Sequence, residues 1–198
     1  MRLRRLLITS VTALLLVLPA SVTVAQDESP ALDPLAALAD SVFAGVFPTE
    51  LGGLPWDDIT VQVGAESFAD QDEEDRADME ALLEELGATS DDMTVANASR
   101  FSFSEEESEF ALISAFRVSG VDAARLLEAF LPTFAEDLEE PMQEDGQVAG
   151  KDVVIVYDAA SDVFFGEAQP LHLYASGETV WIVSAAEPAL TEAFDKLP

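Results

Sequence analysis

The chain offers few side chains that could act as nucleophiles or metal ligands. It has one histidine, His172, and no cysteine, which excludes disulfides, thiolate metal sites and thiol catalysis. No G-x-S-x-G motif presents a serine nucleophile on a constrained turn. His172 alternates with Leu171 and Leu173, a spacing that predicts an ordinary strand residue on the face opposite these leucines. We therefore expect no catalytic residue, no cofactor and no enzymatic activity.

Carboxylates are abundant, with 39 Asp and Glu in 198 residues. The segment DQDEED could bind a cation, and Asp70, Asp72 and Asp75 are the candidate ligands. Calcium loops, however, take their ligands from a tight turn that contains a glycine, whereas DQDEED lacks the glycine and runs directly into a helix pattern. We therefore assign no metal site and prefer a solvated helix face, in which Asp70 and Glu73 form a capping box.

A pair of carboxylates could instead hydrolyse a glycosidic bond. Nothing in the sequence marks such a pair, and no aromatic-rich platform for a sugar surrounds one. A small extracellular carboxylate-dependent hydrolase and a calcium-binding protein remain the alternatives to a binding module. An enzyme should show a cleft in which acids converge with perturbed pKa values, whereas a binding module should show dispersed acids and an apolar face or groove.

Two short features could contact a partner or could serve only the fold. Phe164 and Phe165 in DVFFGE are either core residues or an exposed apolar tip, and they are our candidate partner contact. Arg100 and Arg117 are expected on the hairpin face opposite the phenylalanines. There we expect them to pair with helix carboxylates at little net gain in stability.

Residues 1–25 have the layout of a secretory signal peptide, with three arginines, an apolar run and small residues that end at Ala25. Cleavage there would leave a flexible N-terminus, residues 26–32, and a single α+β domain, residues 33–198. The paired arginines also permit twin-arginine export in place of the general secretory route. No later run approaches the ~20 apolar residues of a membrane span, so we expect a secreted protein without stable membrane insertion.

The formal net charge is −30, and the signal peptide holds three of the nine basic residues and no acidic ones. A field of this sign repels nucleic acid and anionic lipid surfaces. It attracts cations or a basic protein partner, or it serves solubility in a salt-rich medium. The composition does not specify which of these applies.

An internal duplication is the most informative feature of the chain. DITVQVGAES from Asp58 matches DVVIVYDAAS from Asp152, and each is preceded by an expected helix and followed by two expected strands. The repeat unit is helix, strand, strand, strand, in copy one (residues 33–119) and copy two (residues 120–198). The acidic helix is an insertion in copy one. We expect one two-fold operation to relate the two strands together with their preceding helices.

The expected elements form an α+β fold. Its sheet should be mostly antiparallel, with about six strands and with helices packed largely on one face. The order strand, helix, hairpin, helix, strand from Ile59 to Tyr157 is that of a ferredoxin-like split βαβ unit. VVIVY and VWIV are continuously apolar, which predicts central strands with Ile155 and Trp181 buried. The acidic segment EDLEEPMQEDG, which precedes VVIVY, is expected to be a loop or a short helix.

Local signals also predict where elements end and pair. The first helix should run to about Val46, and the helix that begins near Val121 should stop or kink at Pro132. The hairpin should place Phe103 opposite Phe110, with the charged run SEEESE at its tip.

The segments ELGGLPWDDITV and GETVWIVSAAEPAL resemble stretches of uncharacterised secreted bacterial proteins that repeat the same unit. The resemblance covers most of the chain after the signal peptide and implies no assigned activity. With the charge and the lack of catalytic motifs, it leads us to expect a secreted, acidic, non-enzymatic binding or interaction module of unknown ligand.

Overall fold

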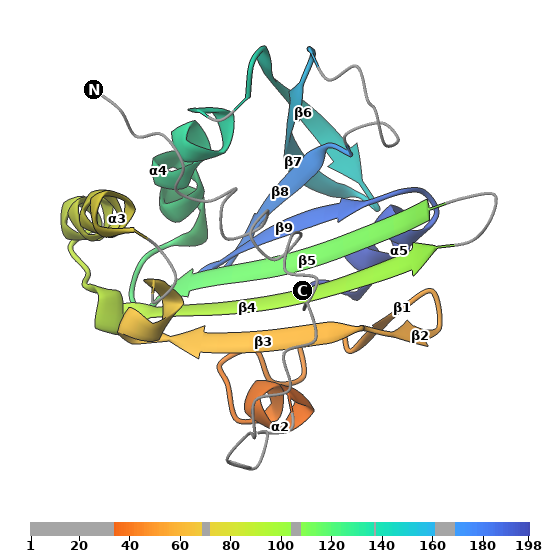
Figure 1. The fold of residues 1–198 in the computed structure, drawn as a ribbon, viewed down its shortest axis with the longest axis horizontal. Coiled ribbons are helices and arrows are strands. Elements are labelled where there is room, and N and C mark those ends of the chain that lie inside the picture. Colours follow the sequence, from red (N-terminus) through yellow and green to blue (C-terminus); the bar gives the residue numbers. More distant parts are fainter. Residues whose placement is uncertain (1–33, 69–71, 104–107, 137, 161–168) are drawn as a thin grey trace, which may run out of the picture.

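The computed structural model describes residues 34–68, 72–103, 108–136, 138–160 and 169–198 (Figure 1). The expected signal peptide, Asp70, Phe164 and Phe165 lie outside these residues. The helices are α2 (Pro34–Ala39), α3 (Glu73–Leu86), α4 (Ala123–Glu136) and α5 (Ala189–Lys196). The strands are β1 (Glu50–Leu51), β2 (Leu54–Pro55), β3 (Asp58–Val63), β4 (Met93–Phe103), β5 (Ser108–Val118), β6 (Pro141–Val148), β7 (Lys151–Asp158), β8 (Leu171–Ser176) and β9 (Thr179–Ala185). None of the described helices has the length and hydrophobicity of a membrane span.

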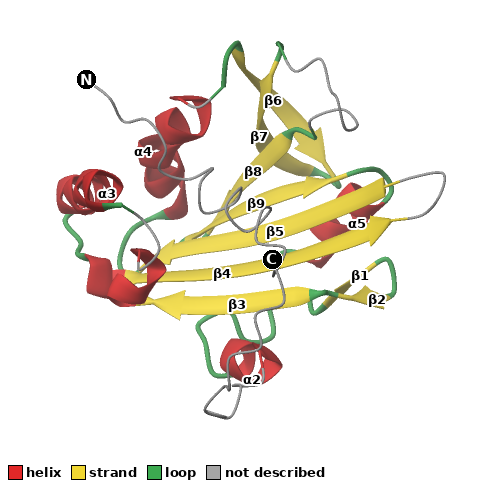
Figure 2. Ribbon diagram, in the orientation of Figure 1, coloured by secondary structure: helices red, strands yellow, loops and turns green. Residues whose placement is uncertain are grey.

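The described chain is an α+β protein with a large antiparallel sheet, which confirms the expected fold class (Figure 2). Seven strands follow the order β3-β4-β5-β9-β8-β7-β6, and every neighbouring pair is antiparallel. β1 and β2 form a separate two-stranded hairpin. Gly52 and Gly53 make its turn with φ angles of 64° and 71°, a region that glycine enters without steric cost.

The sheet exceeds the expected six strands because the acidic segment before β7 is itself a strand. We expected a loop or short helix there, but Pro141–Val148 pairs along its whole length with β7. Ala149 and Gly150 form the turn, and both have positive φ angles, as the commonest two-residue hairpin turn requires. β6 begins with five exposed residues, so it lacks the apolar alternation that reveals a strand in a sequence.

β5 and β9 lie at the centre of the sheet, with β4 and β3 beyond one and β8 and β7 beyond the other. A two-fold axis between β5 and β9 would produce this order from two copies of one unit. Ile59 and Val153, which the repeat aligns, belong to the same core cluster. The helices break the symmetry, because α2 and α4 pack on opposite faces of the sheet. The repeat therefore stays a prediction for the strands and is wrong for their preceding helices.

Helices cover both faces of the sheet, which corrects the expectation that they pack largely on one face. α3 and α4 pack against one face in a core that includes Val95 and Ile182. α5 and the segment from α2 to Trp56 pack against the other face, with Ala96 and Trp181. Because successive strand side chains point to opposite faces, residues adjacent in sequence enter different cores.

β9 is buried on both faces, as VWIV predicts, but β7 is not. Trp181, Ile182 and Val183 are at most 1% exposed, and Val153 is also buried. Ile155 is only partly buried, which corrects the expectation for VVIVY. The cause is position, since β7 is the second strand from the edge and its outer neighbour β6 is largely exposed.

The ferredoxin-like order is not realised in space. In a split βαβ unit, another strand lies between the two strands that the first helix connects. Here those two strands, β3 and β4, pair directly with each other, with Val63 opposite Thr94. The chain between them, including α3, therefore leaves and returns at the same end of the sheet. α3 is an excursion within a hairpin and not a crossover helix.

Three local expectations also change. Phe101, not Phe103, lies opposite Phe110 in the β4–β5 hairpin. A shift of two residues keeps every side chain on its face, so the apolar alternation does not distinguish the two registers. α2 ends early, at Ala39, whereas α4 continues through Pro132 without stopping.

Candidate functional site

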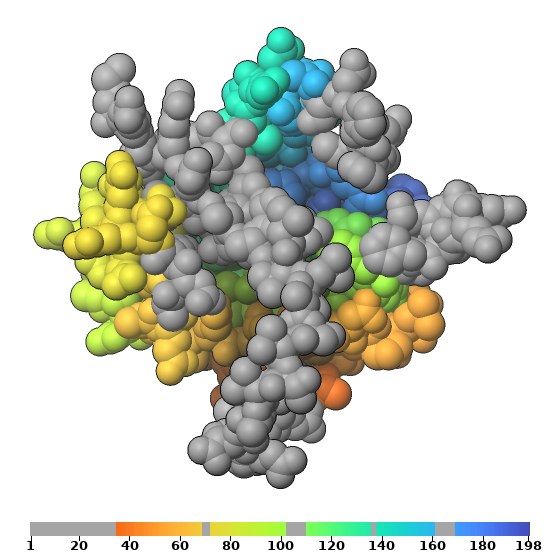
Figure 3. Space-filling view, in the orientation of Figure 1, coloured from red at the N-terminus to blue at the C-terminus, as the bar shows by residue number. Residues whose placement is uncertain are grey.

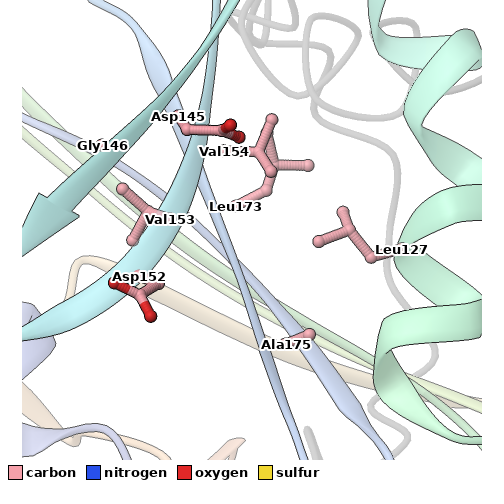
Figure 4. A pocket seen from close by; sticks show the side chains of 8 residues that line it. All are labelled: Leu127, Asp145, Gly146, Asp152, Val153, Val154, Leu173 and Ala175. Carbon is pink, nitrogen blue, oxygen red and sulfur yellow. The ribbon is translucent and has the colours of Figure 1, made fainter.

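A groove of about 370 Å³ opens between α4 and the strands β6, β7 and β8 (Figure 4). Its lining consists of Leu127 from α4, Asp145 and Gly146 from β6, Asp152, Val153 and Val154 from β7, and Leu173 and Ala175 from β8. We call these eight residues the α4–β6 groove. Six of them are apolar or glycine and two are carboxylates, which is the composition of a binding surface with a few polar groups for orientation.

The groove arises because α4 packs mainly on β8 and β9 and leaves the outer strands less covered. Leu126 and Phe130 on α4 are buried in the core. Leu127, on the adjacent side of the helix, is only partly buried and faces the outer strands (Figure 4). In Figure 3, the start of β6 and the end of β7 project together at the upper edge of the molecule.

The two carboxylates lie on the same sheet face as the apolar floor of the groove. Asp152 and Val154 alternate along β7 and so share a face, and Asp145 is directly opposite Val154 in the β6–β7 ladder. Gln147 Nε2 donates to Asp152 Oδ1 at 3.0 Å, which links the two strands at the groove rim. A ligand in the groove would therefore contact carboxylates and apolar side chains at the same time.

Two other carboxyl groups have shifted pKa values, and their hydrogen bonds give each a structural role. Backbone N–H groups of Ala160 and Glu140 hold the pKa of Asp158 below its usual value, with Glu139 contributing less. The pKa of Glu192 is lowered by its hydrogen bond with Lys196 and then by the Gly52 N–H. A lowered pKa keeps these groups ionised, whereas a general acid needs a raised one.

His172 is buried in β8, on the sheet face that also holds Tyr174 and Phe194. Its ring meets Phe194 edge to face, with centroids 6.3 Å apart. Burial lowers the pKa of His172, and backbone hydrogen bonds involving Val183 and Pro170 only partly oppose this effect. Nδ1 of His172 has no hydrogen-bond partner within the described chain. His172 lies in a strand on the face opposite Leu171 and Leu173, as its spacing predicts.

Two of the candidate cation ligands, Asp72 and Asp75, lie at the start of α3, and Asp70 lies outside the described residues. Asp72, not Asp70, is the N-cap residue, and its Oδ1 accepts from the Asp75 N–H at 2.9 Å. Asp75 itself is buried. Gly87 ends the helix in the left-handed conformation, as its sequence position predicts. Across the described residues, no cluster of three or more Asp, Glu or His side chains has metal-binding geometry.

The arginines do not pair with helix carboxylates as expected. Arg100 is buried and donates to the carbonyl oxygens of Leu51 and Leu54, so it holds the β1–β2 hairpin against β4. Arg117 Nη2 lies 2.5 Å from Glu178 Oε2, and Glu178 belongs to the β8–β9 turn. Both arginines therefore connect strands to turns.

The groove is not apparent in the sequence, because Asp145 lies in the segment expected as a loop. One usable signal is Gly150, because glycine is a common turn residue and here follows Ala149 in the turn. Comparisons with protein-family models, with curated proteins and with solved structures gave no match.

Proposed function

We propose that this protein is a secreted, non-enzymatic binding module that takes a cationic, partly apolar ligand in the α4–β6 groove. The observation that carries the proposal is the position of Asp145 and Asp152 beside the floor formed by Leu127, Val154 and Leu173. Lysine and arginine side chains have this same mixed character, because an apolar stem carries a charged head. The net charge of −30 adds long-range attraction for such a ligand.

Binding of a short labelled peptide of alternating lysine and valine residues, followed by fluorescence anisotropy, tests the proposal. The same peptide with glutamate in place of lysine is the ligand control. Affinity for the lysine peptide should fall between roughly 0.01 M and 0.15 M salt, because the Debye length shortens from about 30 to about 8 Å. The glutamate peptide should not bind.

The groove is tested with the double variant Asp145→Asn/Asp152→Asn. An exposed charge pair contributes ~0.2–1 kcal/mol, so loss of two should weaken binding roughly 2- to 30-fold. Glu80→Gln/Glu84→Gln on α3 is the matched control, because it removes the same charge from exposed residues outside the groove lining. Equal weakening by the two double variants would show attraction by net charge only and would contradict the proposed site.

A further inference from the structure

β6 is an edge strand whose outer side is not paired by any strand in the described chain. Its first five residues are exposed, and Met142 retains 46% of its accessible surface. An edge strand of this kind presents backbone N–H and C=O groups that can pair with another chain. The ladder with β7 determines which of them point outward.

A two-residue turn makes the first pair of the hairpin, Val148 and Lys151, a hydrogen-bonded pair, and such pairs then alternate along an antiparallel ladder. The bond from the Ala159 N–H to the Glu140 carbonyl, at 2.9 Å, continues this alternation. Even-numbered β6 residues therefore bond to β7. The backbone groups of Gln143, Asp145 and Gln147 point to the outer edge.

The outward-bonding residues are also those whose side chains face α4. Asp145 lines the groove, and Gln143 and Gln147 share its sheet face because they lie two residues away on either side. A strand added to β6 would thus place alternate side chains beside the groove. Backbone pairing and groove binding are available to one extended ligand at the same time.

We infer that β6 accepts an extended cationic peptide as an additional antiparallel strand, with alternate lysine or arginine side chains directed to Asp145 and Asp152. The inference rests on the proposed function and adds the mode of binding. Strand addition supplies affinity through the main chain, and the groove selects the side chains at every second position.

Charge favours a basic partner over a second copy of this chain. An antiparallel β6–β6 pair centred on Asp145 would place the Asp145 side chains of the two copies opposite each other. A pair centred one residue earlier would place the two Glu144 side chains opposite each other. Like charges directly opposite each other in a sheet are destabilising. The net charge of −30 on each copy adds to this repulsion.

Two isomers of the alternating lysine-valine peptide test the mode of binding. In an antiparallel addition, lysines that face the groove pair with Gln143, Asp145 and Gln147, so their own N–H groups point to β6. N-methylation of the lysines should therefore abolish binding, whereas N-methylation of the valines should change the affinity less than about twofold. The two isomers have the same composition and charge.

Hydrogen exchange gives an independent readout on the protein. Peptide binding should slow exchange of the Gln143, Asp145 and Gln147 amides and leave Glu144 and Gly146, already bonded to β7, nearly unchanged. If both methylated isomers bind like the parent while Asp145→Asn/Asp152→Asn still weakens binding, strand addition is wrong and the proposed function stands. If that double variant behaves like the α3 control, the proposed function fails and this inference fails with it.

Discussion

The backbone N–H of Gly52 donates to Glu192 Oε1 at 2.9 Å, joining the β1–β2 hairpin to α5 across 140 positions of sequence. Lys196 Nζ lies 2.8 Å from the same carboxylate oxygen and donates to the Glu50 carbonyl at 3.0 Å. Glu192 is therefore shared between its own helix and a hairpin from the other end of the domain. This shared carboxylate gives the first prediction.

Glu192→Gln should lower the free energy of unfolding at pH 7, because the variant loses the charge that Lys196 partners. The pKa of Glu192 is lowered in the folded state, so its contribution is present above the unfolded value of about 4.5 and is lost as the pH falls through the folded pKa. Urea denaturation at pH 7 and pH 3 measures this. If wild type and variant still differ in free energy of unfolding by the same amount at pH 3, the ionised Glu192 carboxylate is not the source of the difference.

Arg100→Met should destabilise the protein more than Arg117→Met. The first change leaves the buried Leu51 carbonyl without a donor, at ~1–3 kcal/mol. The second breaks a partly exposed ion pair with Glu178, worth ~0–1 kcal/mol. Chemical denaturation of both variants provides the comparison. If the two variants lose the same free energy of unfolding, the Leu51 and Leu54 carbonyls must accept hydrogen bonds from water when Arg100 is absent.

His172→Leu should make the stability less sensitive to mild acid. Because burial lowers the pKa of His172, the folded state resists protonation, and the wild type should lose stability relative to the variant as the pH falls below about 6.5. One proton limits the slope to about 1.4 kcal/mol per pH unit. Comparing wild type with variant cancels the pH response of the many carboxylates. A constant difference between pH 8 and pH 5 would contradict the effect.

Ile182→Ala should cost ~2–5 kcal/mol, since Ile182 is 1% exposed and central in the sheet. Ile155→Ala should cost less, because Ile155 is partly buried on β7 and its Cδ1 lies over Gly146 near the edge. Equilibrium unfolding of the two variants tests the order. Equal costs would indicate that the outer strands are packed as tightly as the centre.

Calcium should not stabilise the protein beyond its contribution to ionic strength. The acids of α3 form a face of like charges, so monovalent salt should raise the melting temperature by screening. Thermal melts at fixed high ionic strength, with and without calcium, separate screening from binding. A specific site would raise the melting temperature with calcium concentration, and Asp70→Asn/Asp72→Asn/Asp75→Asn would remove that rise.

Apolar periodicity predicts the parts of this fold that are buried on at least one face. The alternation in β3 and the continuous apolar run in β9 both correspond to strands, and the apolar Leu190 and Phe194, four residues apart, are both buried in α5. The N-cap residue of α3 is an example of a detail that the local sequence does not determine. Asp70 and Asp72 offer the same side chain two residues apart, and only the path of the preceding chain decides which one caps.

The candidate site was not predictable in the same way. Asp145 lies on a strand without an apolar pattern, and its meeting with Leu127 depends on how α4 sits across the sheet. The faces covered by helices depend likewise on connections between elements. The Ala149-Gly150 turn joins β6 to β7, and its role in the fold can be recognised only when both flanking segments are known to be strands.

The central position of β5 has a consequence for the order in which the protein is made. β5 pairs with β4 on one side and β9 on the other, and β9 begins at Thr179, well after β5 ends at Val118. Until β9 has been synthesised, the emerging chain carries the apolar β5 with one side unpaired, the kind of edge that promotes aggregation. Premature termination before Thr179 would produce chains in which this side of β5 has no partner strand.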